Sequence, residues 1–407
     1  MSEKMPRFVV AQLGARMHYA VPRIMAAKRL LERLYTDICG NIGWPQLLSL
    51  ISFVNRNSFV RRIIDRETTN IPRDAITDFP LLGIQYAWRR WHATSPSDNT
   101  AAHLWAGRRF ADLVVKRGFG HAGAVYTMNS AGLEILQDAR AHGLFTVMEQ
   151  TIAARAVERQ LLGEEASFFP NWESNACQDL YADDYCSREQ AEWCASDRII
   201  CGSDFVKDSI AMLKGPVDRC RVVPYGIQSD DIHAPDRAAR TGPLRVLTVG
   251  ALGLRKGTPY ILEAAKRLQG KAHFRLVGLA DLHPDALSDL SRWCEVTGPV
   301  VRSDIGRHYE WADLFLLPSI CEGSATATYE ALAWGLPVIC TPNTGSVVRN
   351  GIEGYIVPVR NPSAIVAALE ILADPARRAI ASSAARDRAK EHDLSSYSRR
   401  LLEALQK

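Results

Sequence analysis

Between residues 245 and 340, short apolar runs alternate with amphipathic segments, a pattern that leaves few folds open. The amphipathic segments carry apolar residues at helical spacing, and glycine follows several of the apolar runs. Strands that alternate with helices at this spacing predict a doubly wound parallel sheet that helices cover on both faces. The expected strands are 245–249, 274–277, 295–297, 314–317 and 337–340.

The N-terminal half repeats this alternation less regularly. A helix is expected over 21–34, and residues 44–120 are interpreted as a helical insertion. The polar stretch 226–243 is the best candidate for a linker. We therefore expect two α/β domains, residues 1–235 and 236–391, that face a central cleft where ligands bind at the carboxyl ends of strands. Strands of the first domain are expected at 8–13, 123–127, 144–148, 198–201 and 220–224.

Length, charge and cysteine content narrow the class of protein. The 407 residues exceed what one hydrophobic core usually covers, which agrees with two domains. A net charge of +4 is too small to indicate nucleic acid as a partner, although residues 1–120 hold 18 basic against 9 acidic residues. The nine cysteines form no Cys-x-x-Cys pair and no zinc pattern, so reduced thiols in a cytoplasmic protein are expected. No window supplies the roughly 20 apolar residues of a spanning helix.

Two glutamates bracket a run of small residues after one of the expected strands. Glu322 precedes the expected helix, and Glu330 lies about two turns inside it, which separates them by about 12 Å along the helix axis. The small residues leave the first N–H groups of the helix uncovered, as a diphosphate site requires. Glu322 and Glu330 can each accept hydrogen bonds from a vicinal diol, one of a sugar and one of a ribose. The alternative is an acid that favours the helix dipole and an ordinary surface glutamate. The small residues are Gly323, Ser324, Ala325 and Thr326.

The loop 250–257 follows another expected strand of the same sheet. Its glycines allow a close approach to a ligand, and Arg255 and Lys256 bring positive charge to it. In a transferase these cations would neutralise the charge that builds on a departing diphosphate. The alternative is a solvated basic pair, which the helix dipole disfavours at this position.

Longer stretches around these two motifs resemble the donor domain of retaining glycosyltransferases of family four, which adopt the GT-B fold. The stretches are VGALGLRKGTPYILEA, YEWADLFLLPSICEGSATATYEALAWGLPVICTP and TGSVVRNGIEGYIVP, and RIICGSDFVKDSI with RVVPYGI extends the resemblance into the N-terminal half. The resemblance implies two Rossmann-like domains. It also implies transfer, with retention of configuration, of a hexosyl residue from a nucleotide-diphosphate sugar to a glycan or lipid-linked acceptor, in surface or exopolysaccharide synthesis.

The resemblance also implies roles for individual residues. Lys256 is similar to the lysine that binds the diphosphate, with Arg255 beside it. Glu322 corresponds to the acid that contacts the donor sugar, Glu330 to the one that holds the ribose, and the backbone of 323–326 to the part that faces the phosphates. No metal or other cofactor is implied.

Two further positions and the placement of the last stretch of the chain follow from the same resemblance. Val300 stands where such enzymes read the base, and Gly14 begins the N-terminal loop that faces the donor phosphates and the acceptor. The residue pattern itself predicts helix throughout 376–406. The resemblance implies that the final stretch, 392–407, packs back on the N-terminal domain.

The chain departs from the family pattern at two places. Ala251 stands where many members carry arginine, and Arg255 is a candidate to supply that charge. Glu149 and Gln150 stand where many members carry histidine after the strand 144–148, which leaves the N-terminal domain without an assigned catalytic group.

Other interpretations remain open at this point. The same architecture would suit a nucleotide-sugar epimerase, which needs no acceptor, or a non-catalytic subunit that binds nucleotide sugars. Residues 46–64 mix large apolar residues with three arginines, and the cluster 86–91 reads YAWRRW. Both could contact the cytoplasmic face of a membrane or pack on the N-terminal sheet with their arginines in water.

Overall fold

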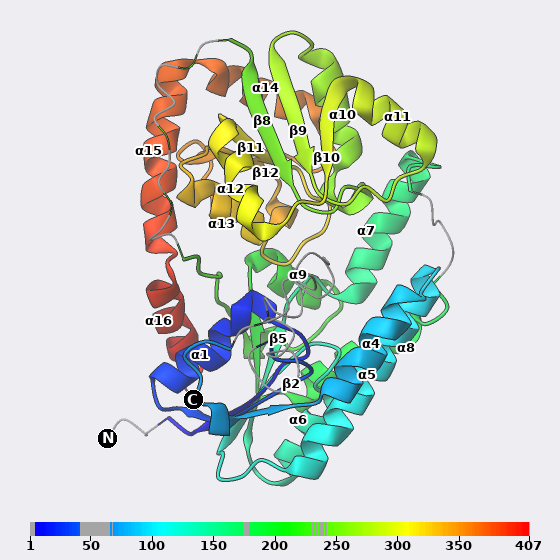
Figure 1. Cartoon of the computed structure of the whole chain (residues 1–407), viewed down its shortest axis with the longest axis vertical. Coiled ribbons are helices and arrows are strands. Elements are labelled where there is room, and N and C mark those ends of the chain that lie inside the picture. The colour runs from blue at the N-terminus through cyan, green and yellow to red at the C-terminus, as the bar shows by residue number, and fades with distance from the viewer. Residues whose placement is uncertain are drawn as a thin grey trace, which may run out of the picture.

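The protein consists of two lobes, one above the other, each built around a parallel sheet (Figure 1). The computed structural model describes residues 5–40, 66, 68–173, 179–228, 232, 235, 240 and 242–406. The basic segment 46–64 lies outside these residues. Eight of the nine cysteines lie within them, and all eight are free thiols.

The N-terminal lobe contains a seven-stranded parallel sheet in the order β3-β2-β1-β4-β5-β6-β7. Its strands are β1 (Phe8–Ala11), β2 (Leu31–Thr36), β3 (Ile76–Asp78), β4 (Ala124–Met128), β5 (Phe145–Gln150), β6 (Arg198–Cys201) and β7 (Cys220–Val222). Its helices are α1 (Ala20–Ala27), α4 (Pro80–Trp91), α5 (Pro96–Arg117), α6 (Leu133–Ala141), α7 (Arg155–Phe168), α8 (Ala182–Ala195) and α9 (Asp204–Met212). The predicted doubly wound arrangement is confirmed because side chains of β1 alternate between two cores. Phe8 and Val10 pack with α1, whereas Val9 and Ala11 pack with α5 and α6.

The C-terminal lobe contains a six-stranded parallel sheet in the order β10-β9-β8-β11-β12-β13. Its strands are β8 (Leu244–Val249), β9 (Ala272–Val277), β10 (Cys294–Gly298), β11 (Leu314–Leu317), β12 (Val338–Cys340) and β13 (Gly354–Ile356). Its helices are α10 (Thr258–Arg267), α11 (Pro284–Trp293), α12 (Arg302–Trp311), α13 (Thr326–Ala333), α14 (Pro362–Ala373) and α15 (Pro375–Glu391). All five strands that the periodicity predicted are present within one or two residues.

The structure corrects three expectations of secondary structure. The helix over 21–34 ends at Ala27, because the chain reverses at Arg29 (φ 57°) and continues as β2. The segment 44–120 is not purely helical, since β3 adds an edge strand to the sheet. The segment 376–406 is broken after Glu391, where Asp393 accepts a hydrogen bond from the Ser396 N–H and begins α16 (Leu394–Ala404).

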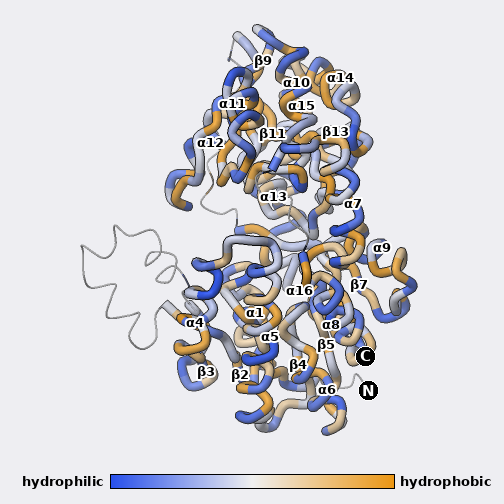
Figure 2. Tube along the Cα trace, turned by 90° about the vertical axis from the view of Figure 1, so that its right-hand side faces the viewer, coloured by the Kyte–Doolittle hydropathy of each residue, from blue (hydrophilic) through white to orange (hydrophobic). Residues whose placement is uncertain are grey.

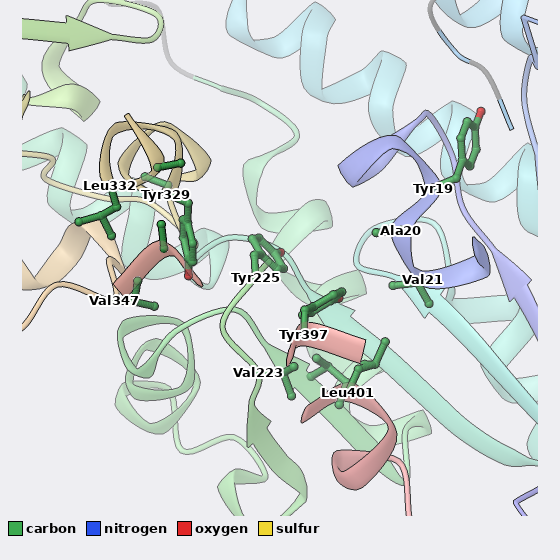
Figure 3. Close-up of a cluster of buried hydrophobic side chains, with 14 of the residues drawn as sticks. Tyr19, Ala20, Val21, Val223, Tyr225, Tyr329, Leu332, Val347, Tyr397 and Leu401 are labelled. Carbon is green, nitrogen blue, oxygen red and sulfur yellow. The ribbon is translucent and has the colours of Figure 1, made fainter. Parts of the chain in front are cut away.

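The last helix lies against the N-terminal lobe although it follows the C-terminal one (Figure 1). Arg400 of α16 donates to the Pro224 carbonyl over 3.1 Å. Tyr397 packs edge-on against Tyr225, with ring centroids 6.2 Å apart. Figure 3 shows that Tyr225 lies between Tyr397 and Tyr329 of α13, so one apolar cluster continues from one lobe to the other.

Helix α7 connects the lobes on the opposite side (Figure 1). Glu165 is fully buried and accepts a hydrogen bond from the Tyr260 hydroxyl of α10 over 2.9 Å. Arg360 of the C-terminal lobe pairs with both Glu164 and Glu165. The two lobes therefore meet through α16, α7 and the loops between them, and these loops form the site described next.

Candidate active site

The loop between β8 and α10 is wrapped closely around one lysine. Gly250 has φ 142°, a conformation that side-chain-bearing residues rarely adopt, and a Cβ there would lie 2.9 Å from Lys256 Cε. Leu254–Lys256 forms a single turn of 3-10 helix that directs Lys256 into the lobe. The loop is held from outside by Glu173, whose Oε1 accepts the Leu254 N–H over 2.7 Å. The glycine position thus allows the chain to close over a buried cation.

Lys256 and Glu322, which are distant in sequence, form a buried ion pair. The Lys256 Nζ lies 2.7 Å from Glu322 Oε1, and each residue is only 8% exposed. Arg255 Nη2 lies 3.6 Å from the same oxygen, on the more open side. Burial lowers the pKa of the Lys256 ammonium, and the Glu322 carboxylate partly offsets this effect. Two cations therefore converge on one carboxylate at the carboxyl ends of β8 and β11.

The start of α13 offers unpaired amides, though fewer than the sequence indicated. The Ala325 N–H donates to the Thr344 carbonyl over 3.2 Å, which is a correction to the expectation that all four small residues leave free amides. The N–H groups of Gly323, Ser324 and Thr326 have no acceptor within the described part of the chain. The Ser324 hydroxyl points inward and donates to the Gly345 carbonyl over 3.1 Å, so only its backbone faces outward.

Glu330 lies one turn inside α13, not two, because the helix begins at Thr326. Its Oε2 accepts a hydrogen bond from the Tyr309 hydroxyl over 2.7 Å. Glu330 and Thr326 line a cavity of about 570 Å³ between the lobes, together with residues of α1, α12 and the stretch after β7. Val300 is two residues before Arg302, which lines the cavity, but does not line it itself. Its side chain is partly buried and packs against the adjacent core. Glu330 therefore faces an interdomain cavity, while Glu322 pairs with Lys256 in the preceding loop.

The N-terminal lobe contributes the loop after β1. Gly14 lies in this loop, but its N–H already donates to Asp37 Oδ1 over 3.0 Å, so that amide is engaged within the lobe. Met17 and His18 line the same cavity as Glu330. Both residues have positive φ angles, 45° and 49°, and such strained residues cluster at functional sites.

Two contacts across the lobes were not anticipated from the sequence. Ser203, the N-cap of α9, donates its hydroxyl proton to the Gly323 carbonyl. Glu158 of α7 lies 3.9 Å from Arg255 Nη1 and links the donor-side loop to the N-terminal lobe. The position of Ser203 shortly after β6 is a sequence signal for a residue at the carboxyl edge of the sheet. The sequence gives no such signal for Glu158, which reads as an ordinary surface residue of a helix.

The residues that replace the family's histidine are held in the core. Glu149 accepts hydrogen bonds from the hydroxyls of Tyr126 and Tyr225, over 2.6 and 2.9 Å. Burial raises its pKa, and these two hydroxyl groups oppose that effect. Gln150 bonds to Glu189 and Trp193. Both side chains serve the packing of β5 and leave the cleft to other groups.

The cluster of Lys256, Arg255 and Glu322 lies at the carboxyl edge of one parallel-sheet lobe, and this lobe faces a second one. Two such lobes facing each other are the GT-B architecture. Residues 243–374 match the family model of group 1 glycosyl transferases. The match covers the C-terminal lobe, including Lys256, Glu322 and Glu330.

Individual glycosyltransferases are similar to part of the chain. The amylovoran biosynthesis glycosyltransferase AmsK of Erwinia amylovora is 29% identical over 38% of this chain and 42% of its own length. A D-inositol 3-phosphate glycosyltransferase of Kineococcus radiotolerans is 30% identical over 47% of this chain and 53% of its own length. The aligned part of the chain thus spans about half the length of these curated relatives. The crystal structure of Anabaena Alr3699/HepE in complex with UDP and glucose has the same fold, with a TM-score of 0.63 over 99% of both chains at 14% identity.

Proposed function

We propose that this protein is a glycosyltransferase that moves a hexosyl residue from a nucleotide-diphosphate sugar to a glycan or lipid-linked acceptor. The observation that carries the proposal is the convergence of Lys256 and Arg255 on Glu322, beside the unpaired amides that begin α13. The Anabaena structure, which holds UDP and glucose, supports a donor of this class. The relative that acts in amylovoran biosynthesis supports a role in surface or exopolysaccharide synthesis.

Each group in the cluster has a role in this proposal. The diphosphate takes the amides of Gly323, Ser324 and Thr326 as donors, because a helix N-terminus favours anions. Lys256 and Arg255 turn from Glu322 toward the departing diphosphate and stabilise its growing charge. Glu322, released from this pair, accepts hydrogen bonds from hydroxyls of the sugar. The second Glu330 oxygen accepts from the ribose diol while Tyr309 holds the first.

The proposed reaction is a substitution at the anomeric carbon. The bond from this carbon to the diphosphate oxygen breaks, and the diphosphate leaves with the bonding electrons. The acceptor hydroxyl oxygen bonds to the same carbon from the same face, and its proton passes to the departing phosphate oxygen. Retention of configuration rests on the resemblance to retaining enzymes. We propose that no metal ion is needed, since Arg255 and Lys256 supply positive charge where the diphosphate leaves.

Turnover of a donor panel tests the proposal. Purified protein is incubated with UDP-, GDP-, dTDP- and ADP-sugars, with and without saccharide and polyprenyl-diphosphate-sugar acceptors, and nucleoside diphosphate release is followed by ion-exchange chromatography. We expect acceptor-dependent release from one donor, and a product whose anomeric coupling in proton NMR matches that of the donor. Interconversion of donors without an acceptor would identify an epimerase, and binding without turnover would identify a non-catalytic subunit; either result contradicts the proposal.

We also propose that helix α4 places the protein on an anionic membrane surface. Every helix among the described residues is too short or too polar to cross a bilayer. However, α4 lies at the edge of the lower lobe (Figure 2). Large apolar side chains are exposed along this helix. Leu81, Trp88 and Trp91 are 77%, 58% and 81% exposed, and with Ile84 they follow helical spacing. Arg89 and Arg90 flank the stripe, as in helices that lie in an anionic interface.

Vesicle co-sedimentation tests the membrane contact. We expect the protein to sediment with phosphatidylglycerol vesicles, and the double variant Trp88→Ala/Trp91→Ala to lose most of this binding. Met212→Ala, which removes a 64% exposed side chain from α9, is the control and should bind as wild type. Equal sedimentation of wild type and the tryptophan variant would rule out α4 as the contact.

A further inference from the structure

A second cavity lies in the N-terminal lobe, at the carboxyl ends of the strands of its sheet. It is on the opposite side of the cleft from the cluster of Lys256 and Glu322. Its volume is about 520 Å³, within the usual range of small-molecule sites. The loop after β1 and helices α4, α5, α7 and α8 form its walls. Three guanidinium groups line it, those of Arg16, Arg90 and Arg155. Each comes from a different element, so their convergence results from the tertiary fold.

The charges around this cavity do not balance. Arg155 is paired, since it bonds to Glu158 over 2.7 Å and to Asp179 over 3.2 Å. Arg16 and Arg90 form no ion pair among the residues that the structure describes, although the charge of Arg16 acts to lower the pKa of the buried Glu149 carboxyl. Two guanidinium groups without an ion pair therefore line the cavity.

The other acid in the wall does not provide the missing charge. Glu189 is buried and accepts hydrogen bonds from the Gln150 side chain over 2.7 Å and from the Arg155 N–H over 2.8 Å. Burial raises its pKa to about 7, so near neutral pH it carries only part of a negative charge.

The same arginines lower the pKa of a histidine in the cavity wall. The pKa of His103 is lowered to about 4, first by burial and then by Arg90, Arg155 and Arg16. The imidazole is therefore neutral at pH 7, and it shares a hydrogen bond with the Tyr86 hydroxyl. The cavity thus combines neutral hydrogen-bonding groups in its wall with a positive rim, which suits a sugar that carries an anionic group.

The cavity adjoins the proposed donor site. Glu158 lines it and also lies 3.9 Å from Arg255, next to the pair of Lys256 and Glu322. A molecule held here would lie beside the departing diphosphate, which is the position of the second substrate in the proposed reaction.

We propose that this cavity binds the acceptor through a carboxylate or phosphate group, which Arg16 and Arg90 hold by paired N–H donors. The acceptor is thus an acidic or phosphorylated saccharide, with its sugar ring against His103 and Tyr86. This inference rests on the proposed function, since an acceptor requires a transferase.

Calorimetric titration with three probes tests this inference. Glucose, glucuronate and glucose 6-phosphate are titrated into the full chain, alone and with saturating nucleoside diphosphate. We expect glucuronate or glucose 6-phosphate to bind about 10-fold or more tightly than glucose. Arg16→Gln and Arg90→Gln should each lose about 10-fold in that affinity. Arg89→Gln is the matched control, because Arg89 neighbours Arg90 but lies 4.2 Å over the Trp105 ring.

The outcomes separate this inference from the proposed function. Preference for glucuronate supports a carboxylate, and preference for glucose 6-phosphate supports a phosphate. Equal binding of glucose and both anions, no anion binding, anion binding unchanged in both variants, or displacement of the anion by nucleoside diphosphate would each overturn the inference. If nucleoside diphosphate binds in that case, the proposed function stands; if no nucleoside diphosphate binds, the proposed function fails.

Discussion

The pair formed by Lys256 and Glu322 provides a quantitative prediction. Breaking a buried ion pair costs about 3–5 kcal/mol of stability, because one charge stays buried without its partner. For Lys256→Met we expect about 3 kcal/mol, since Arg255 remains 3.6 Å from Glu322. For Glu322→Gln we expect about 4 kcal/mol, because the buried Lys256 then has no carboxylate partner and Arg255 keeps only its longer contact with Glu158, 3.9 Å. The double variant removes the buried charges together and should lose only about 1–2 kcal/mol.

Thermal unfolding by differential scanning calorimetry at pH 7.5 measures these effects. A loss of 1 kcal/mol shifts the Tm of a lobe of this size by about 2–4 °C. Lys256→Met should therefore lower the Tm by about 6–12 °C, and the double variant by about 2–8 °C. Lys266→Met is the control, because Lys266 forms a pair of similar length with Asp289, 2.9 Å, at 37% exposure. Solvent screens that pair, and its loss should cost less than about 1 kcal/mol. Equal shifts for Lys256→Met and Lys266→Met, or additive losses in the double variant, would refute the reasoning.

Three further predictions concern the close packing at Gly323, the pH dependence of stability and metal independence. In Gly323→Ala the new Cβ would lie 2.1 Å from the Thr151 carbonyl of the other lobe, so kcat/KM for transfer should fall about 10-fold or more; Gly163→Ala, with nothing within 4 Å, should leave it unchanged. Burial raises the pKa of Glu192 to about 7, so its stabilising protonated form is lost as the pH rises through 7. Urea unfolding should show stability falling between about pH 4.5, the ordinary value, and about pH 7, and levelling off above it. Glu192→Gln should make this fall shallower, and the remainder belongs to Glu189, whose pKa is also raised to about 7; an unchanged slope would contradict the prediction. Transfer activity should persist in excess EDTA, and a loss restored by Mg²⁺ would disprove metal independence.

The sequence predicted the C-terminal lobe well because its strands are continuous apolar runs separated by helices of regular length. Periodicity was less informative near residue 30. There the apolar spacing of α1 continues into β2, and the left-handed turn at Arg29 that separates them leaves no glycine or proline as a signal. The short edge strands β3 and β13 have three residues each, too few for a visible alternation.

The candidate site was predictable only in part. The motif residues Lys256, Arg255 and Glu322 come together as their positions after neighbouring parallel strands require. The second cavity was not predictable, because Arg16 and Arg90 are 74 residues apart in the sequence and line the same cavity only through tertiary packing. The engagement of the Gly14 and Ala325 amides within the protein likewise depends on partners that are distant in sequence.

Calorimetric titration of nucleoside diphosphates and their sugars into wild type, Lys256→Met and Glu330→Ala tests the central claim most directly. One nucleotide sugar should bind the wild type, and each variant should bind it about 10-fold or more weakly while circular dichroism shows that both remain folded. Undiminished affinity in both folded variants would place the donor elsewhere and contradict the account.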